Sequence, residues 1–250
     1  MSQAEQYEKC PHQYELQRLR KVKPRPAAWS HQGTAFHAAI ETYEEGGRTL
    51  AEGEVANVFH VEYVAATKQA LADEPNLDNW LTAGTDGKSD IEARYARGLE
   101  QARSYVRWAE DHKPAIWKDR AGALGIERHL TADIGGVTVQ GYVDQLLDQP
   151  DGSVRVRDLK TGSMKSKFQL KTYGVLARKV LGVVVNHADW YMAKTGKLSR
   201  PIDVTGVAEE EVAEKFAVLD ASVKAGHFPA KPGFHCRFCS VSHACSFRSR

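Results

Sequence analysis

The four cysteines constrain the fold of this chain more than any other feature of its sequence. Three of them, Cys236, Cys239 and Cys245, lie in "HCRFCSVSHAC" near the carboxyl end, and the fourth is Cys10. Thiolates at this spacing are typical of a metal centre, and such centres usually take four donors. If Cys10 is the fourth donor, the two ends of the chain must meet and close a loop of 226 residues (236 minus 10). The logarithmic length term for closing such a loop is about 5 kcal/mol.

The compartment and the identity of the metal follow from the residues around these cysteines. The first 21 residues are polar and charged where a secretory signal needs an apolar run, so we expect a cytoplasmic protein. In a reducing compartment, cysteines at this spacing are more typical of metal ligands than of disulfides. Zinc suits an all-thiolate tetrahedral site, and His235 or His243 could replace one thiolate. Spacing alone leaves both zinc and an iron-sulfur cluster open.

The composition is that of an ordinary globular protein. The chain is 42% hydrophobic and 26% charged, which argues against disorder and against a membrane protein. Its 250 residues are enough for one core with an insertion. The net charge of +2 gives no global signature of nucleic-acid binding. Locally, residues 153–179 contain eight basic side chains and one acid, which indicates either a solvated helix face or a phosphate-binding track.

The spacing of apolar residues changes from helical to alternating along the chain. From residue 122, the runs "ALGIERHLTADI", "GVTVQGYVDQLL" and "SVRVRDLKTG" alternate and are separated by turn residues, which predicts an antiparallel meander. A strand is also predicted over "VVVNHADWYMA". The predicted helices cover about residues 5–20, 33–45, 54–72, 90–112, 166–182 and 207–226. This order indicates an α/β fold with a helical insertion.

The run "VRVRDLKTG" carries the most chemistry. The strand period of two places Asp158 and Lys160 on the same face as Val154 and Val156. Charges on a buried face need a metal, each other or an opening to solvent. Asp144 precedes the hairpin turn by a distance that brings it alongside Asp158. Two carboxylates beside a lysine predict a divalent-metal site, and an ordinary Asp-Lys ion pair at a strand end is the alternative.

Taken together, these segments resemble the RecB-like branch of the PD-(D/E)XK nucleases, in the iron-sulfur subgroup that includes CRISPR-associated and AddB-type exonucleases. The resemblance implies a restriction-endonuclease-like core, with a central mixed β-sheet flanked by helices. It implies a single nuclease domain over residues 1–250, with a helical insertion at about 50–120 and an iron-sulfur-bound segment, 227–250, joined to the first helix through Cys10. The matching pieces are "GTAFHAAIE" with His37, "GYVDQLL" with Asp144, "DLKTG" with Asp158 and Lys160, "QLKTYG" with Gln169 and Tyr173, the early "CP" and the cysteine tail.

The resemblance implies a role for each matching residue of the catalytic set. Asp144 and Asp158 would hold one or two Mg²⁺ or Mn²⁺ ions on the scissile phosphate. His37 and the Leu159 carbonyl would be further ligands, and the imidazole would favour Mn²⁺. Lys160 would orient or help to deprotonate the attacking water and would stabilise charge in the transition state.

Four further side chains have weaker assignments. Gln169 and Tyr173 are four residues apart and share a helix face, which in the family lies near the active site and the DNA backbone. Tyr173 fits a core position equally well. Glu41 and Glu127 are lesser candidates for an acidic ligand, because surface or ion-pair roles are favoured for each.

The basic run and the tryptophans could extend a nucleic-acid surface. In the context of a nuclease, Lys165, Lys167 and Lys171 would flank the phosphate track. Three tryptophans could stack on unpaired bases, although a tryptophan at helical spacing is more often a core residue. They are Trp80, Trp108 and Trp117.

The expected function is that of a metal-dependent DNA exonuclease, acting on single-stranded or resected ends and stabilised by a 4Fe-4S cluster. Two alternatives are a catalytically silent DNA-binding or assembly module and an iron-sulfur regulator, and the complete set of Asp144, Asp158 and Lys160 disfavours both. The expected partners are DNA and proteins of recombination, phage DNA metabolism or CRISPR adaptation, without a membrane. The cluster ligands implied by the resemblance are Cys10, Cys236, Cys239 and Cys245.

Overall fold

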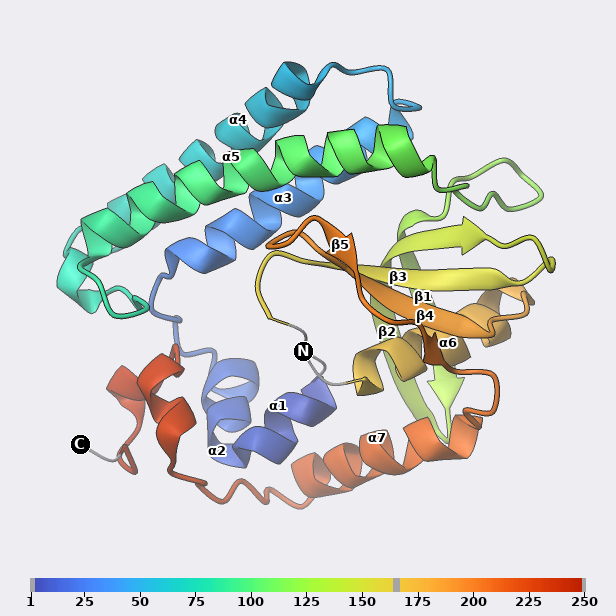
Figure 1. The fold of residues 1–250 in the computed structure, drawn as a ribbon. Helices are drawn as coiled ribbons and strands as arrows, with labels where there is room; N and C mark the ends of the chain where they lie inside the picture. Colours follow the sequence, from blue (N-terminus) through green and yellow to red (C-terminus); the bar gives the residue numbers. More distant parts are fainter. Residues whose placement is uncertain (1–2, 164–166, 249–250) are drawn as a thin grey trace.

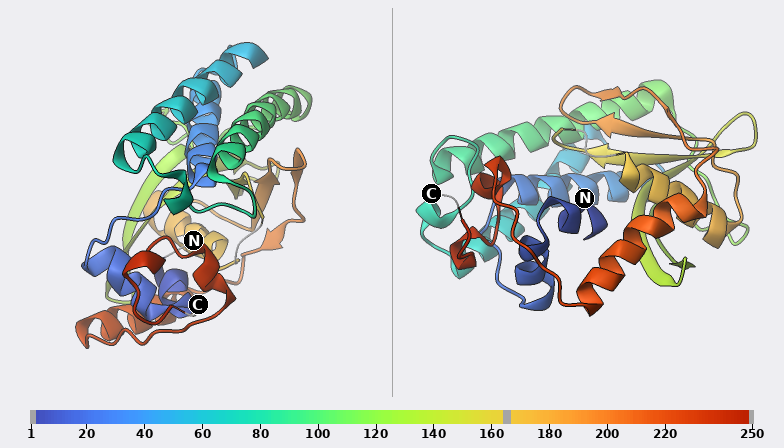
Figure 2. Two further views of the ribbon diagram at one scale, coloured as in Figure 1. Left: turned by 90° about the vertical axis from the view of Figure 1, so that its left-hand side faces the viewer. Right: turned by 90° about the horizontal axis from the view of Figure 1, so that it is seen from below.

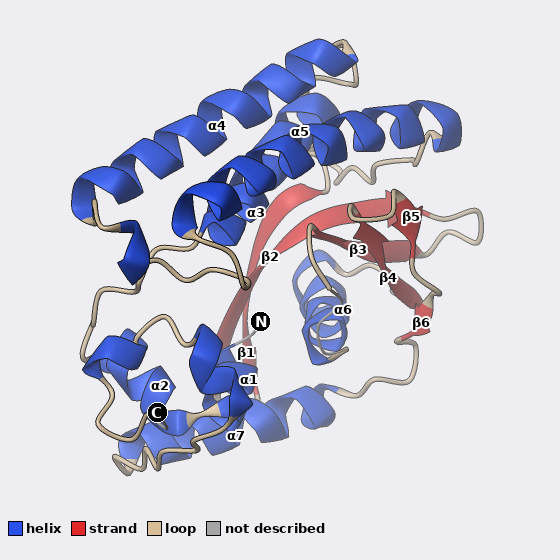
Figure 3. Ribbon diagram, turned by 60° about the vertical axis from the view of Figure 1, so that its left-hand side comes forward, coloured by secondary structure: helices blue, strands red, loops and turns tan. Residues whose placement is uncertain are grey.

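The computed structural model describes residues 3–163 and 167–248, which form a β-sheet with helices on both of its faces (Figure 1). Three long helices lie over one face, and two helices lie on the opposite side (Figure 3). The long helices are α3 (Ala28–Glu45), α4 (Glu52–Asp73) and α5 (Gly87–His112), and the others are α6 (Phe168–Leu181) and α7 (Glu209–Lys224). The chain therefore has the α/β architecture that the order of its elements predicts.

The sheet is mixed, with the order β1-β2-β3-β4-β5, and β6 also pairs with β4. Its first three strands form the expected antiparallel meander, and β4 runs parallel to β3. The short strands β5 and β6 were not predicted, because two residues cannot show a period. The bounds are β1 (Ile126–Ile134), β2 (Val137–Asp148), β3 (Val154–Lys160), β4 (His187–Met192), β5 (Lys197–Leu198) and β6 (Ile202–Asp203).

The helices α3, α4 and α5 confirm the predicted helical periodicity, although each begins a few residues earlier than expected. In α5, Asp86 precedes the first turn, and its carboxylate accepts a hydrogen bond from the Ser89 amide at 2.9 Å. This N-cap satisfies an amide that would otherwise lack a partner. None of the helices in the described ranges is long and apolar enough to span a membrane.

Buried polar contacts hold the long helices against the sheet. The Tyr105 hydroxyl on α5 donates to Glu44 on α3 at 2.6 Å and accepts from Gln145 on β2 at 2.5 Å. Close packing also joins α4 to α5, since a Cβ at Gly98 would lie 2.0 Å from the Phe59 ring. The Tyr105 hydroxyl therefore links α3 to β2, and close packing holds α4 against α5.

The three tryptophans considered for base stacking pack against the rest of the protein. Trp80 and Trp108 are 3% and 8% exposed, and Trp117 is partly buried against the core beneath the sheet. Trp108 also stacks under the Arg157 guanidinium at 5.2 Å. The stacking interpretation is therefore wrong for Trp80 and Trp108, because tertiary packing covers both indoles.

The amino-terminal helices and the carboxyl-terminal segment lie side by side (Figures 1 and 2). The amino-terminal helices α1 (Gln3–Lys9) and α2 (Pro11–Tyr14) continue into a π-helical turn at Glu15–Leu19. Leu16 of this turn packs with Cys239 and Val241 of the carboxyl-terminal segment. Each terminal segment therefore buries apolar surface against the other.

Candidate active site

The carboxylates of Asp144 and Asp158 come from neighbouring strands, β2 and β3, and both are buried. Asp144 accepts a hydrogen bond from the backbone amide of Leu159 at 2.6 Å, which holds its side chain against β3. Lys160 lies 2.6 Å from Asp158 and forms an ion pair with it. The hairpin thus brings the two aspartates and the lysine together, in agreement with the pattern of the two strands.

The imidazole of His37 reaches these carboxylates from α3. Its Nδ1 lies 3.6 Å from Asp144 and 3.3 Å from Glu127, which belongs to β1. One ligand atom from each of these three side chains can be chosen so that all lie within 4.8 Å of one another, a spacing that suits a shared metal ion. The cluster therefore takes its donors from one helix and two strands.

Glu127 has a more central place in this cluster than its sequence context suggests. Its backbone has a φ of +42°, which is a left-handed conformation inside a strand and costs strain in a residue other than glycine. Sequence reasoning favoured a surface or ion-pair role, because an acid at the start of a strand is common. A signal existed in the hairpin register: Ile126 pairs with Gln145 and Arg128 with Val143, which places Glu127 opposite Asp144.

The remaining candidates occupy positions around the aspartates. Gln169 on α6 donates to Asp158 at 3.0 Å and to the Tyr173 hydroxyl at 2.9 Å. The shared helix face predicted for Gln169 and Tyr173 is thus directed at the carboxylates, and Tyr173 also packs against the core. Glu41 lines the same cavity as His37 but is outside the three-residue cluster.

A cavity of about 800 Å³ opens beside the cluster. Leu159 and Lys160 form part of its wall, so the backbone around the proposed carbonyl ligand borders the cavity. At another part of the wall, the guanidinium of Arg94 from α5 lies 5.8 Å from the ring centre of Trp29. The cavity therefore combines acidic metal donors with a cationic and an aromatic side chain.

Burial and charge together shift the proton affinities of the cluster. Burial alone would lower the pKa of His37, but the charges of Asp144, Glu127 and Asp158 outweigh it and raise this pKa to about 9. Burial raises the pKa of Asp144 to about 7, with His37 opposing and Asp158 adding to the shift. Burial also raises the pKa of Asp158, and Lys160 opposes this. The carboxylates lie close together, so their negative charges repel one another, and a bound divalent cation would neutralise them.

These shifts predict that the metal-free protein loses stability as the pH rises. Between pH 6.5 and about 9, His37 keeps its proton in the folded protein and has lost it in the unfolded chain. The stabilisation that protonated His37 gives the fold is therefore complete below pH 6.5 and is lost as the pH rises through about 9. Asp144 also lowers the stability of the fold as the pH rises from 3.8 to about 7, because its carboxyl keeps a proton in the folded protein that the unfolded chain has lost. We expect the melting temperature of chelator-treated protein to fall over this range.

The His37→Gln variant should flatten the upper part of this pH profile, measured by differential scanning fluorimetry. His60→Gln is the matched control, since His60 lies on the exposed side of α4 and contacts Tyr95. An equal slope in wild type and His37→Gln would contradict the prediction.

Acids on α7 and β4 neutralise much of the basic run. Lys171 and Lys179 pair with Glu211 and Glu209 of α7, so a count over residues 153–179 overstates the free positive charge. The expected phosphate track stays a prediction for Lys171, whose charge is partly balanced by Glu211, and Lys165 lies outside the described residues. Lys167 is exposed and has no ion pair within the ranges that the structure describes. The paired arginines of β3 are Arg155 and Arg157, which contact Asp189.

The four cysteines line one small cavity between the two ends of the chain. His235 also lines this cavity, whereas His243 borders a different one. The Gly233 amide donates a hydrogen bond to the Cys236 sulfur at 3.4 Å, an interaction that stabilises a metal-bound thiolate. Burial raises the pKa of Cys239, and the neighbouring cysteines raise it further, so a bound cation would favour its thiolate form. The lining cysteines are Cys10, Cys236, Cys239 and Cys245.

Comparisons with known proteins match nearly the whole chain. The chain is 36% identical over 256 residues to the Gene 69 protein of Mycobacterium phage D29, across 98% of this chain and 95% of that protein. It is 34% identical over 276 residues to the Gene 69 protein of Mycobacterium phage L5, across 98% of this chain and 94% of that protein. The sequence profile of the PD-(D/E)XK nuclease superfamily matches residues 1–246. With nearly its whole length matched and an acidic cluster that suits a divalent metal, this chain belongs to the PD-(D/E)XK nuclease superfamily.

Proposed function

We propose that this protein is a metal-dependent DNA exonuclease of the RecB-like branch, acting on single-stranded or resected ends. The observation that carries the proposal is the convergence of His37, Asp144, Asp158 and Lys160 beside one open cavity. An Asp-Lys ion pair serving only structure would not need the imidazole and a second buried carboxylate beside it. The same grouping disfavours a catalytically silent assembly module and an iron-sulfur regulator.

The donors fit a hard divalent cation. His37, Asp144 and Asp158 would hold Mg²⁺ or Mn²⁺, together with Glu127 and the Leu159 carbonyl, and the imidazole favours Mn²⁺. When bound, the ion polarises the phosphate and lowers the pKa of a coordinated water.

The surrounding side chains would position the reacting groups. The Lys160 ammonium, held by Asp158, would orient the attacking water and stabilise the negative charge that develops on the phosphate oxygens. Gln169 would keep the Asp158 carboxylate in place through its 3.0 Å hydrogen bond. Both contacts fix the same carboxylate, so the phosphate would meet a preorganised set of charges.

The preference for unpaired DNA is supported by two further side chains that line the same cavity, Trp29 and Arg94. The Arg94 guanidinium lies over the Trp29 ring and is also paired with Asp90 at 3.2 Å. An aromatic ring with a cation is a combination that binds bases and phosphates without sequence preference. The test compares linear and circular single-stranded DNA, together with end-labelled duplexes that have blunt or recessed ends, in Mg²⁺ or Mn²⁺. Degradation of linear DNA with survival of the circle supports the proposal. Equal cutting of circles would indicate an endonuclease, and inert substrates would indicate the silent module.

Glu127 tests the composition of the metal site. Replacing it by glutamine should weaken Mn²⁺ binding about tenfold or more, because one charged donor of the cluster is lost. Glu41→Gln is the control, since Glu41 lines the same cavity outside the cluster. Calorimetric titration with Mn²⁺ measures both variants, and equal affinities would remove Glu127 from the site.

We also propose that the cysteine cavity binds a 4Fe-4S cluster with a structural role. Four thiols at one cavity support this ligand set, and the position of His243 away from it disfavours one form of the zinc alternative. Residues 1–250 would then form a single nuclease domain, with 50–120 as an insertion and 227–250 held to the first helix through Cys10. Iron and acid-labile sulfide in protein purified without oxygen would support the cluster, and stoichiometric zinc would contradict it.

The biological setting follows from the proposed chemistry. DNA is the proposed partner in the cytoplasm of the host cell, and no membrane is involved. Both relatives are proteins of mycobacterial phages, which favours phage DNA metabolism over recombination or CRISPR adaptation as the host process.

A further inference from the structure

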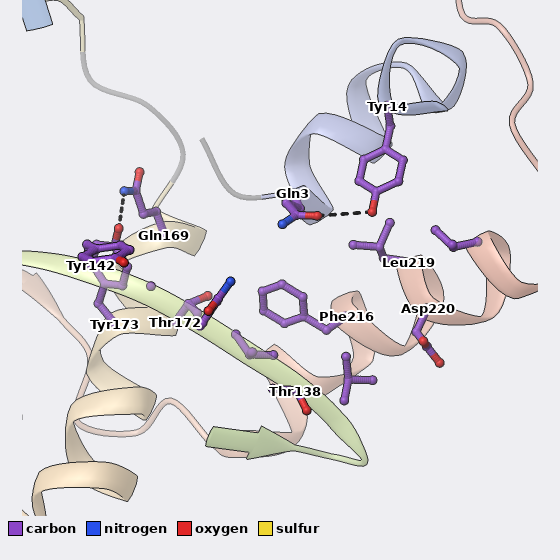
Figure 4. Close-up of a pocket in the computed structure, with 15 residues that line it drawn as sticks. Gln3, Tyr14, Thr138, Tyr142, Gln169, Thr172, Tyr173, Phe216, Leu219 and Asp220 are labelled. Carbon is purple, nitrogen blue, oxygen red and sulfur yellow. Dashed lines mark hydrogen bonds between the residues drawn. The ribbon is translucent and has the colours of Figure 1, made fainter. Parts of the chain in front are cut away.

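A second cavity, of about 590 Å³, is lined in part by α6 and α7 (Figure 4). It is bordered by α1, α2, the first half of β2, α6 and α7. The ring of Phe216 lies near the middle of the view, with Tyr14 and Gln3 on one side and Gln169 and Tyr173 on the other (Figure 4). Cavities of this size hold small organic groups.

The two cavities approach the same pair of carboxylates from different sides. His37 and Lys160 line the first cavity and contact Asp144 and Asp158 at 3.6 and 2.6 Å. Gln169 lines the second cavity and contacts Asp158 at 3.0 Å. If the scissile phosphate of a DNA strand lay at these carboxylates, the nucleotide on one side of it would lie at the first cavity and the nucleotide on the other side at the second.

The chemistry of the second cavity suits a nucleobase better than a phosphate. No lysine or arginine is among its described lining residues, and Asp220 adds a negative charge that repels phosphate. The wall instead offers amides, hydroxyls and aromatic rings, which match the hydrogen-bonding edges and flat faces of a base. These polar and aromatic residues include Gln3, Tyr14, Gln169, Thr172, Tyr173 and Phe216.

Two groups at this wall have hydrogen-bonding capacity to spare. Gln169 Oε1 is buried and has no hydrogen-bond partner among the residues that the structure describes. The ladder between β2 and β3 covers only Gln145–Asp148 of β2, so the first part of β2 is paired with β1 alone. Unpaired strand edges present amides and carbonyls to a neighbour. A base could use these groups only if its own pairing edge were free.

We propose that this cavity binds the unpaired nucleobase next to the scissile phosphate, so that cleavage requires an end that is not base-paired. The inference deepens the proposed function and rests on it. A duplex end would have to unpair before its base could enter, which is the physical basis of the preference for single-stranded or resected DNA. An extended peptide added to the free edge of β2 is the competing occupant.

The test fills the cavity without removing an existing contact of the metal site. Val223 lines the cavity from the same face of α7 as Phe216 and Leu219, so Val223→Tyr would occupy part of it. Val218→Tyr is the matched control, because Val218 is 61% exposed on α7 and does not line the cavity. Substrates are end-labelled single strands with one abasic site placed at each of the positions nearest the end.

Wild type and Val218→Tyr should cleave the strand about tenfold more slowly when the base at one position is missing, because a stacked base is lost. Val223→Tyr should cleave the intact strand about tenfold more slowly and should no longer respond to that abasic site. The inference is overturned if wild type ignores every abasic site or if Val223→Tyr keeps the full response. The second result would favour the peptide as occupant, and the absence of any cleavage would count against the proposed function instead.

Discussion

The Asp158→Asn variant is expected to cleave DNA about 1,000-fold more slowly than wild type, with its fold intact. Asp158 is the carboxylate on which the site converges, since Lys160 and Gln169 both contact it and Asp144 lies on the neighbouring strand. Asparagine keeps the shape and the acceptor for Gln169 but removes the charge needed to hold a cation, and losses of one preorganised electrostatic group already reach 10²–10³-fold. Single-turnover cleavage of labelled single-stranded DNA in Mn²⁺ measures this effect.

Two further variants separate the functions of the site. Asp151→Asn is the control, because Asp151 lies in the exposed turn between β2 and β3. Lys160→Gln should also remove activity but should leave Mn²⁺ binding nearly unchanged, since the ammonium is not a ligand. Rates near wild type in Asp158→Asn, at an unchanged melting temperature, would reject the assigned site.

The second large effect is expected at the cysteines. Replacing Cys10 by serine should lower the free energy of unfolding by up to about 5 kcal/mol, because the link that closes the 226-residue loop is lost. Net stabilities are typically about 5–15 kcal/mol, so this variant should be partly unfolded at physiological temperature. Urea unfolding of protein purified without oxygen, together with its iron content, measures the change.

The control for Cys10→Ser is His243→Ala, since His243 borders a neighbouring cavity and not the one lined by cysteines. It should keep both the metal content and the unfolding midpoint of wild type. If Cys10→Ser kept a full complement of iron and wild-type stability, the two ends of the chain would not be joined through the cluster.

Much of the active site could be predicted because its information is local. Alternation along β2 and β3 and the short turn between them place Asp144 near Asp158, and the two-residue period places Lys160 on the same face as Asp158. His37 could be added only through the resemblance to a family, because nothing in the pattern of α3 says which strand it meets. Glu127 was only a lesser candidate in the sequence, because its place beside His37 and Asp144 depends on the register of β1 and β2 and on its left-handed backbone conformation.

Other errors have a common cause in contacts between distant segments. Lys171 and Lys179 look unopposed in the sequence, yet glutamates 40 and 30 residues away pair with them once α6 and α7 are adjacent. Trp108 fits a stacking surface in sequence and is covered in the fold by α5 packing over the sheet. The second cavity likewise takes its walls from both ends of the chain and from the middle.

The sequence by itself determined the order of the longer strands and helices, the acidic pair with its lysine, and the set of four thiols, because each depends on residue type and short-range spacing. Only the tertiary structure decided which charges remain free, that Glu127 joins His37 and Asp144, and that a cavity with no lysine or arginine among its described lining residues adjoins the carboxylates. These features depend on how helices pack across the sheet. Packing is set by the summed fit of many side chains, which no local period encodes.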